Sequence, residues 1–261
     1  MTDSYPVAPV WGQPLDLLGI PVHPVDAHAV HHYISRVIAA NQKALVLNVN
    51  IHCCNLTWQT PWLQKFLGGA QLVFCDGDGV RWGLRILGLD PPPKITYDRW
   101  IWQLSGFAAQ KGYTYYFLGS QPGIAEAAAR MIEARVPGAR VVGTHHGYFA
   151  KQGEENEKVI GEINRLKPDI LILGFGMPIQ EKWLLENWQR VHAHIFLTGG
   201  AVFEYVAGKA RRAPAWMIRA NLEWLFRFYE EPKRLFKRYV YGNPYFMVRV
   251  FCEKIRRKLK K

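Results

Sequence analysis

A short, wholly apolar segment that ends in glycine constrains the fold of this chain more than any other feature. Ile170 to Leu173 has the composition of a strand buried on both faces, and it breaks at the Gly-Phe-Gly tripeptide 174–176. Pro178 can then begin a helix. Glycines after a strand let a bulky group approach the backbone, and the helix N-terminus offers free N–H groups to an anion. The segment predicts a strand beside a nucleotide or phosphorylated sugar, although an ordinary turn has the same pattern.

Strands and helices alternate through most of the chain. Strands are predicted at residues 17–22, 44–49, 71–74, 113–118, 140–142, 170–173 and 194–197. Helices are predicted at residues 25–41, 79–87, 98–111, 122–135, 154–166 and around Gln180. This alternation is typical of an α/β fold, a Rossmann-like parallel sheet with helices on both faces. Ligands of such sheets bind at the carboxyl ends of the strands, so the glycines that follow three of the strands should line one edge.

The last fifth of the chain has a different character. Residues 1–204 carry 17 Lys+Arg and 17 Asp+Glu, whereas residues 205–261 carry 16 and 4, so the net charge of +12 lies entirely in the tail. The tail is also rich in aromatic residues, and it predicts two or three amphipathic helices broken at Pro232 and Pro244. We therefore predict an α/β catalytic domain at 1–208 and a basic helical appendage at 209–261. Such charge asymmetry points to a nucleic acid, an anionic membrane or a diphosphate-bearing substrate.

Composition argues against several other classes of protein. No apolar run approaches the roughly 18–20 residues of a transmembrane helix. The N-terminal residues lack the basic and apolar regions of a secretory signal. The four cysteines and nine histidines show neither a zinc spacing nor a disulfide framework. We expect buried, reduced thiols in a cytoplasmic protein.

Two carboxylates follow the strand predicted at 71–74. Asp76 and Asp78 lie in a glycine-rich turn, and three interpretations of them compete. They hold a divalent metal on a nucleotide diphosphate, or one of them takes a proton from a sugar hydroxyl, or they cap the next helix. Asn48 and Asn50 end another strand, where their amides can bind sugar hydroxyls or a uracil edge.

Several blocks, in the same order along the chain, resemble the bacterial WecG/TagA/CpsF glycosyltransferases, a family with its own fold type, GT-E. The resemblance covers roughly Leu17 to Phe246. Its most characteristic block is residues 173–181, LGFGMPIQE. The other blocks are residues 48–52, 75–80, 116–120, 143–149, 199–208, 211–216, 222–227 and 231–234.

The resemblance implies an inverting transferase that moves a sugar from a UDP-sugar to a polyprenyl-diphosphate-linked acceptor. Asp76 matches the position of the catalytic base, which can accelerate transfer by about 10²–10⁴-fold. No metal or other cofactor is expected, so Asp78 becomes a capping or supporting group. The residues expected to bind the donor are Asn48, Asn50, Gly119, Gly147, Gly174, Gly176, Pro178, Gln180, Glu181, Gly199 and Gly200.

The resemblance also implies that the basic tail associates with a membrane. Its interleaved aromatic and basic residues suit a helix lying on an anionic bilayer. We expect a peripheral protein on the inner face of the bacterial cytoplasmic membrane. The same aromatic residues are compatible with a subunit interface in a homo-oligomer. The residues expected to bind the acceptor diphosphate are Lys94, Arg211, Arg212, Arg219, Arg227 and Arg234.

The chain departs from the family pattern at four positions. Lys94 replaces an arginine, Tyr97 a glycine, Asn48 a frequent threonine and Glu204 the usual aspartate. These departures indicate a subfamily with a different donor or acceptor. We favour an exopolysaccharide enzyme that uses a UDP-hexose or UDP-uronate, and acetamido sugars such as UDP-N-acetylmannosamine stay open.

Three rival functions follow from the same features. The first is a metal-dependent transferase with Asp76 and Asp78 as D-x-D ligands, and the second is a non-catalytic nucleotide-binding scaffold of a polysaccharide-assembly complex. The third is a nucleic-acid-binding module, which the basic aromatic tail suggests. The body of the chain is electrically neutral and carries no familiar nucleic-acid motif, so we expect no nucleic-acid partner.

Overall fold

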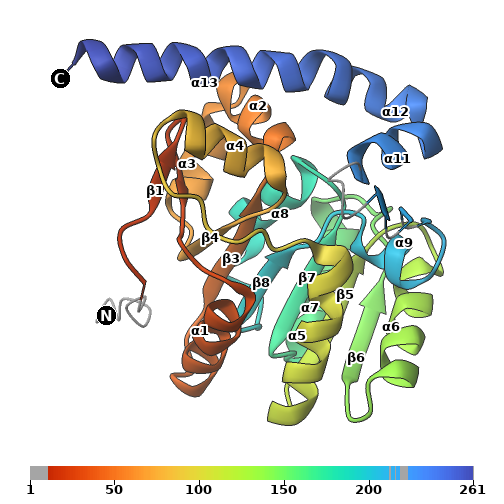
Figure 1. The fold of residues 1–261 in the computed structure, drawn as a ribbon. Coiled ribbons are helices and arrows are strands. Elements are labelled where there is room, and N and C mark those ends of the chain that lie inside the picture. The colour runs from red at the N-terminus through yellow and green to blue at the C-terminus, as the bar shows by residue number, and fades with distance from the viewer. Residues whose placement is uncertain (1–10, 212, 215, 218–222, 261) are drawn as a thin grey trace.

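A six-stranded, wholly parallel sheet forms the centre of the molecule (Figure 1). This computed structural model describes residues 11–260 except 212, 215 and 218–222. The strand order is β4-β3-β8-β7-β5-β6, with helices on both faces, which confirms the predicted fold class. The strands are β3 (Ala44–Val49), β4 (Leu72–Cys75), β5 (Thr114–Gly119), β6 (Arg140–His145), β7 (Ile170–Gly174) and β8 (Ile195–Thr198).

The first predicted strand is wrong, because residues 15–22 form a hairpin. β1 (Leu15–Leu17) pairs antiparallel with β2 (Ile20–Val22) through a two-residue turn. Leu18 and Gly19 both have positive φ, 58° and 83°, the combination that a tight hairpin turn requires. The apolar residues on either side made the turn resemble a continuous strand.

The helices predicted between the strands are confirmed. They are α1 (Ala27–Ala39), α4 (Asp78–Ile86), α5 (Tyr97–Lys111), α6 (Ile124–Arg135), α7 (Gly153–Leu166) and α8 (Ile179–Asn187). The sequence did not predict α2 (Ile51–Gln59), α3 (Pro61–Gly68) or the short α9 (Val202–Val206). α2 is rich in His, Cys, Asn and Thr, which have modest helix propensity, so its existence depends on its cap and on packing.

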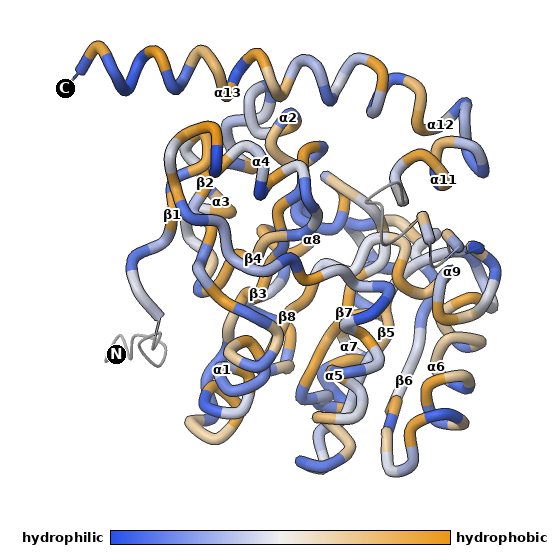
Figure 2. The backbone as a smooth tube through the Cα atoms, in the orientation of Figure 1, coloured by the Kyte–Doolittle hydropathy of each residue, from blue (hydrophilic) through white to orange (hydrophobic). Residues whose placement is uncertain are grey.

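Each face of the sheet packs against its own group of helices. Successive side chains of a strand point to opposite faces. In β3, Leu45, Leu47 and Val49 belong to the core shared with α2, α3, α7 and α8. Ala44 and Val46 belong to the core shared with α1, α5, α6 and α9. Figure 2 shows the strands as largely hydrophobic, as expected for a sheet covered on both sides.

The C-terminal segment is helical and lies across the body. It comprises α11 (Glu223–Glu230), α12 (Pro232–Phe236), a π-helical turn (Lys237–Tyr241) and α13 (Gly242–Leu259). The break predicted at Pro232 is confirmed. The break predicted at Pro244 is wrong, since helical backbone continues from 232 to 259 through the π turn. A π turn already departs from i→i−4 bonding, so a proline just after it disturbs the helix little.

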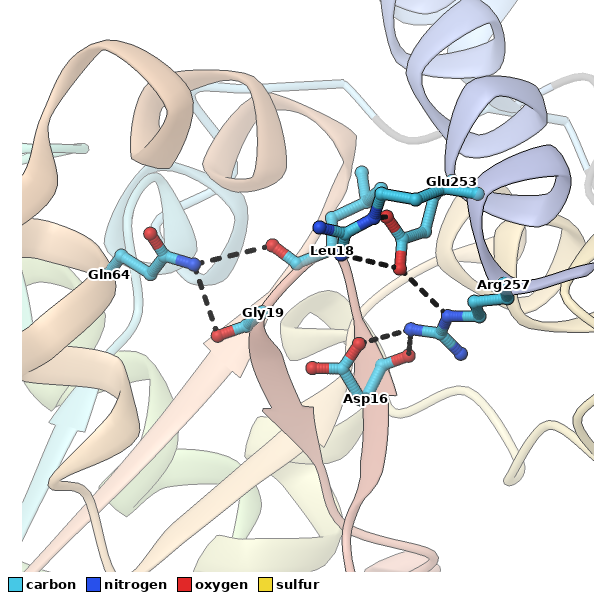
Figure 3. Close-up of polar contacts among 7 residues, drawn as sticks. Asp16, Leu18, Gly19, Gln64, Glu253 and Arg257 are labelled. Atoms are coloured by element: carbon cyan, nitrogen blue, oxygen red, sulfur yellow. Dashed lines mark hydrogen bonds and ion pairs between the residues drawn. The ribbon is translucent and has the colours of Figure 1, made fainter. Parts of the chain in front are cut away.

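α13 is fastened to the body by apolar and polar contacts. Phe246 and Val250 are fully buried in the core shared with α2 and α3. The Asn55 amide of α2 donates to the Gly242 carbonyl (2.7 Å). At the far end, Arg257 binds Asp16 of β1 and Glu253 of its own helix (Figure 3). The boundary proposed at residue 208 stays a prediction. None of the helices in the described ranges combines the length and hydropathy that crossing a membrane requires.

Candidate active site

A cavity of about 500 Å³ opens at the carboxyl ends of the strands. One part of its wall, here called the floor, comes from the loops that follow β3, β4, β7 and β8. The other part, here called the cover, comes from α11, the π turn and the start of α13. The floor comprises Asn48, Asn50, Asp76, Gly176, Gln180, Thr198, Gly199 and Gly200. The cover comprises Trp224, Arg227, Arg238, Tyr239 and Asn243.

The Asp76 carboxylate is the centre of the floor. Its Oδ2 accepts hydrogen bonds from the side-chain amides of Asn48 (2.9 Å) and Asn50 (3.3 Å). Removal from water raises the pKa of Asp76, while the two amides and the charges of Arg227 and Arg238 oppose that rise. The net shift is upward. A carboxylate with a raised pKa is a stronger base, which suits it to take a proton from a hydroxyl group.

The two asparagines are themselves held in place. The Thr198 hydroxyl donates to Asn48 Oδ1 (2.9 Å), which turns the Asn48 amide nitrogen toward Asp76. Asn50 Oδ1 accepts from the Cys53 amide and so caps α2, again leaving the nitrogen for Asp76. Both asparagines were predicted to bind the donor; they line the cavity, and their side-chain nitrogens orient the carboxylate.

The second carboxylate of the turn has different partners. Asp78 lies in the first turn of α4 and forms ion pairs with Lys94 and, at 3.3 Å, with Arg81. Lys94, predicted to bind the acceptor diphosphate, lines the cavity with its ammonium against Asp78. Within the described residues, no group of three His, Cys, Asp or Glu side chains is arranged to hold a metal.

The glycines predicted to bind the donor fall into two groups. Gly176, Gly199 and Gly200 line the cavity. Gly119 and Gly174 are partners in neighbouring strands, and a Cβ on Gly119 would lie 2.5 Å from the Gly174 backbone. A Cβ on Gly147 would lie 3.0 Å from the Phe175 ring and 3.3 Å from the Gly119 Cα. Neighbouring residues of the protein therefore occupy the space beside these three glycines, which lie outside the cavity lining.

Gln180 and Glu181 begin α8 and are both buried. Gln180 Oε1 accepts the backbone N–H groups of Gly176 and Gly200, each at 3.2 Å. Its Nε2 donates to Glu181 Oε1 (2.8 Å). Burial raises the pKa of Glu181 to about 7. Gln180 lines the cavity as predicted, whereas Glu181 and Pro178 lie outside its lining.

Two arginines of the C-terminal segment reach the cavity. Arg227 comes from α11 and Arg238 from the π turn, and the charge of each lowers the pKa of Asp76. Burial and the charge of Arg238 also lower the pKa of His52 to about 4. Of the other predicted acceptor residues, Arg211 is exposed outside the cavity lining. Arg212, Arg219 and the side chain of Arg234 lie outside the described residues.

Sequence reasoning missed most of the aromatic lining. Trp82, Tyr97, Tyr205 and Tyr239 line the cavity together with Trp224. The density of aromatic residues in the tail was the sequence feature that could have indicated this lining, but we attributed it to a membrane surface. Trp82 on α4 and Tyr205 on α9 carried no signal, because they lie in segments whose apolar pattern also predicts a core.

The sequence of this chain matches a family of known enzymes. The profile described as "Glycosyl transferase WecG/TagA/CpsF family" matches residues 15–260. An enzyme of Bacillus spizizenii named N-acetylglucosaminyldiphosphoundecaprenol N-acetyl-beta-D-mannosaminyltransferase is 25% identical over 207 residues, 78% of either chain. The Bacillus subtilis enzyme of the same name is 27% identical over 204 residues, 78% of this chain and 76% of its own. The Staphylococcus aureus enzyme is 31% identical over 146 residues, 56% of this chain and 54% of its own.

The family profile spans nearly the whole chain, from the hairpin to the end of α13. That span includes the floor, the cover and the helix that carries the cover. The resemblance seen in the sequence motifs is therefore confirmed: the chain belongs to the WecG/TagA/CpsF family and is a glycosyltransferase.

Proposed function

We propose that this enzyme transfers a sugar from a UDP-sugar to a polyprenyl-diphosphate-linked glycan, with inversion and with Asp76 as the base. The observation that carries the proposal is the Asp76 carboxylate, oriented by two amides in a cavity lined by two arginines. The acceptor hydroxyl oxygen attacks the anomeric carbon as the bond from that carbon to the UDP oxygen breaks. The hydroxyl proton goes to Asp76, and UDP leaves with the bonding electron pair.

The cover supplies positive charge for the leaving group. Arg227 and Arg238 face a cavity in which a departing diphosphate gains negative charge, and guanidinium groups bind such oxygens well. The reaction then needs no metal. The ion pairs of Asp78 with Lys94 and Arg81 support this, because they already neutralise the second carboxylate of the D-x-D sequence.

The relatives' name supports the acceptor. Those enzymes are named for transfer of N-acetylmannosamine to N-acetylglucosaminyl-diphospho-undecaprenol. We propose an acceptor of this class here, and UDP-N-acetylmannosamine as the first donor to test, ahead of UDP-hexoses and UDP-uronates. Synthesis of an exopolysaccharide or another cell-surface polysaccharide is the setting that such an acceptor suggests.

The outer side of α13 suits a membrane surface. Four exposed apolar residues recur at helical spacing and form one stripe on the side away from the buried Phe246 and Val250. Basic side chains flank this stripe, the pattern of a helix that lies in an anionic interface. We propose peripheral binding to the cytoplasmic face of the membrane through this stripe. It consists of Val248, Phe251, Ile255 and Leu259.

The decisive experiment measures UDP release from a panel of UDP-sugars with a prenyl-diphosphate-linked N-acetylglucosamine acceptor, with and without EDTA. We expect acceptor-dependent release from one donor that EDTA leaves unchanged. Release that EDTA abolishes would favour the D-x-D mechanism. Absence of release from every donor, with UDP still bound, would favour a scaffold.

A further inference from the structure

The two glycine turns of the floor are joined by a single side chain. Gly176 follows β7 and Gly200 follows β8, and both adopt positive φ, 81° and 55°. The backbone N–H groups of both donate to one oxygen, Gln180 Oε1, at 3.2 Å each. Gln180 is 1% exposed and lines the cavity, so its amide ties two walls of the cavity together.

The orientation of that amide is set by its neighbour. Gln180 Nε2 donates to Glu181 Oε1 (2.8 Å), so the amide nitrogen is occupied and the oxygen faces the two glycines. A rotation of the amide by 180° would place the NH₂ group against two N–H donors and lose all three hydrogen bonds. Glu181 is 1% exposed, and its Oε2 has no hydrogen-bond partner among the residues that the structure describes.

Burying a carboxyl group with one oxygen that accepts no hydrogen bond costs folding free energy. Such a group therefore calls for an explanation in terms of function. Burial raises the pKa of Glu181 to about 7, far from the value of an ordinary glutamate. The carboxyl is not in the cavity lining, which favours a role through its neighbours. Its described side-chain hydrogen bond goes to Gln180.

We propose that Gln180 and Glu181 form a clamp that holds the Gly176 and Gly200 turns at the spacing the substrate requires, with both acting as positioning residues. Gln180 joins the turns, and Glu181 fixes the direction of the Gln180 amide. The part of this proposal that concerns substrate rests on the proposed function, whereas the clamp itself is a property of the fold.

The clamp can be tested by exchanging its two members. In the double variant Q180E/E181Q, the carboxylate at 180 still accepts both glycine N–H groups, and the amide at 181 donates to it. Every hydrogen bond is kept, and only the one between residues 180 and 181 changes direction. Q180L removes the acceptor, and E181L removes the group that orients the amide. Q64L is a matched control, because the Gln64 amide donates to Leu18 and Gly19 of the distant hairpin turn (Figure 3).

The first readout is hydrogen exchange of the Gly176 and Gly200 amides in the full-length protein, which requires no substrate. We expect exchange to be about tenfold faster in Q180L, and faster to a smaller degree in E181L. Exchange should return to the wild-type rate in Q180E/E181Q and be unaffected by Q64L. Unchanged exchange in Q180L, or fast exchange in the double variant, would overturn the clamp.

The second readout is UDP affinity measured by calorimetry. We expect a loss of about tenfold in Q180L and recovery in Q180E/E181Q. If the double variant recovered slow exchange but not UDP affinity, the positioning role would be overturned in favour of a direct contact between the Gln180 amide and substrate. If the wild-type protein bound no UDP, the proposed function would fail while the exchange rates still decided the clamp.

Discussion

The floor and the cover of the cavity are built in opposite ways. The floor consists of short loops after buried strands, and its polar groups satisfy one another: Thr198 holds Asn48, and Asn48 holds Asp76. The cover comes from helical segments, and its Trp224 is a large aromatic residue that stays 45% exposed. The floor is thus set in place by the sheet, whereas the position of the cover depends on how α13 docks. We infer that the floor performs the proton transfer and that the cover adds charge around it.

The largest effect should come from the centre of the floor. Asp76→Asn keeps the shape but cannot take a proton, and we expect turnover to fall by about 10³-fold with UDP affinity little changed. Initial-rate kinetics and calorimetry on the same preparation measure both quantities. Asp78→Asn is the matched control, and it should cost less than about tenfold. Equal losses in the two variants would remove the distinction between the carboxylates.

The next effect should come from the cover. Arg238→Ala should lower turnover by about 10–100-fold, since one cation facing the leaving group is lost. It should also raise the pKa of Asp76, because the arginine charge now lowers it. The base must be ionised to act, so activity is lost as pH falls through that pKa. The acidic limb of the kcat/KM profile should therefore move to higher pH.

The exposed neighbour Lys237 of the same π turn provides a control for Arg238. Lys237→Ala should leave the acidic limb where it is. If the acidic limb of the pH profile did not move in Arg238→Ala, the charge of the cover would not affect the pKa of Asp76. The two regions would then act separately.

A smaller effect should follow from removing a hydrogen bond of the floor while leaving its charges unchanged. Thr198→Val removes the hydroxyl that orients Asn48, and we expect a several-fold fall in turnover from the less fixed amide. Thr57→Val is the comparison, because that buried hydroxyl donates within α2, to the Cys54 carbonyl. If the two variants behaved alike, the Thr198 hydroxyl would have no special part in the floor.

The smallest effect should come from the far end of α13. Arg257→Ala removes an exposed ion pair with Asp16, and such pairs contribute about 0–1 kcal/mol. We expect thermal denaturation to shift by only a few degrees and turnover to change less than twofold. A large loss of activity would mean that the cover is held by this end of the helix rather than by Phe246 and Val250.

The sheet and the position of Asp76 at its edge could be predicted from sequence because both depend on local patterns. A four-residue apolar run such as 170–173 that ends in glycine is too short for a helix and favours a buried strand, and a carboxylate in the turn after such a strand lies at the edge where ligands bind. The hairpin at Leu18 escaped prediction because a leucine with positive φ leaves no trace in an apolar pattern. α2 escaped because its start depends on the Asn50 cap, and Asn50 was assigned to the donor instead.

Two features of the site lay beyond sequence reasoning because they are tertiary. Gly119 and Gly174 were assigned to the donor, but the space beside Gly119 is filled by the Gly174 backbone and the space beside Gly174 by the Phe203 ring, which only the tertiary structure reveals. Arg238 was one of many arginines in the tail. What distinguishes it is the docking of α13, where Phe246 contacts Gly83 so closely that a Cβ there would lie 2.7 Å from the Phe246 ring.

The π turn of residues 237–241 determines which way the arginine points. In an uninterrupted α-helix, residues eight apart such as Arg238 and Phe246 lie roughly 80° apart around the axis. A π turn takes up one residue more, so the angle closes to about 20°, and both side chains leave the helix on nearly the same side. Because of this one extra residue, Phe246 and Arg238 both face the body of the protein. Burial of Phe246 in the core therefore also places the Arg238 guanidinium at the cavity.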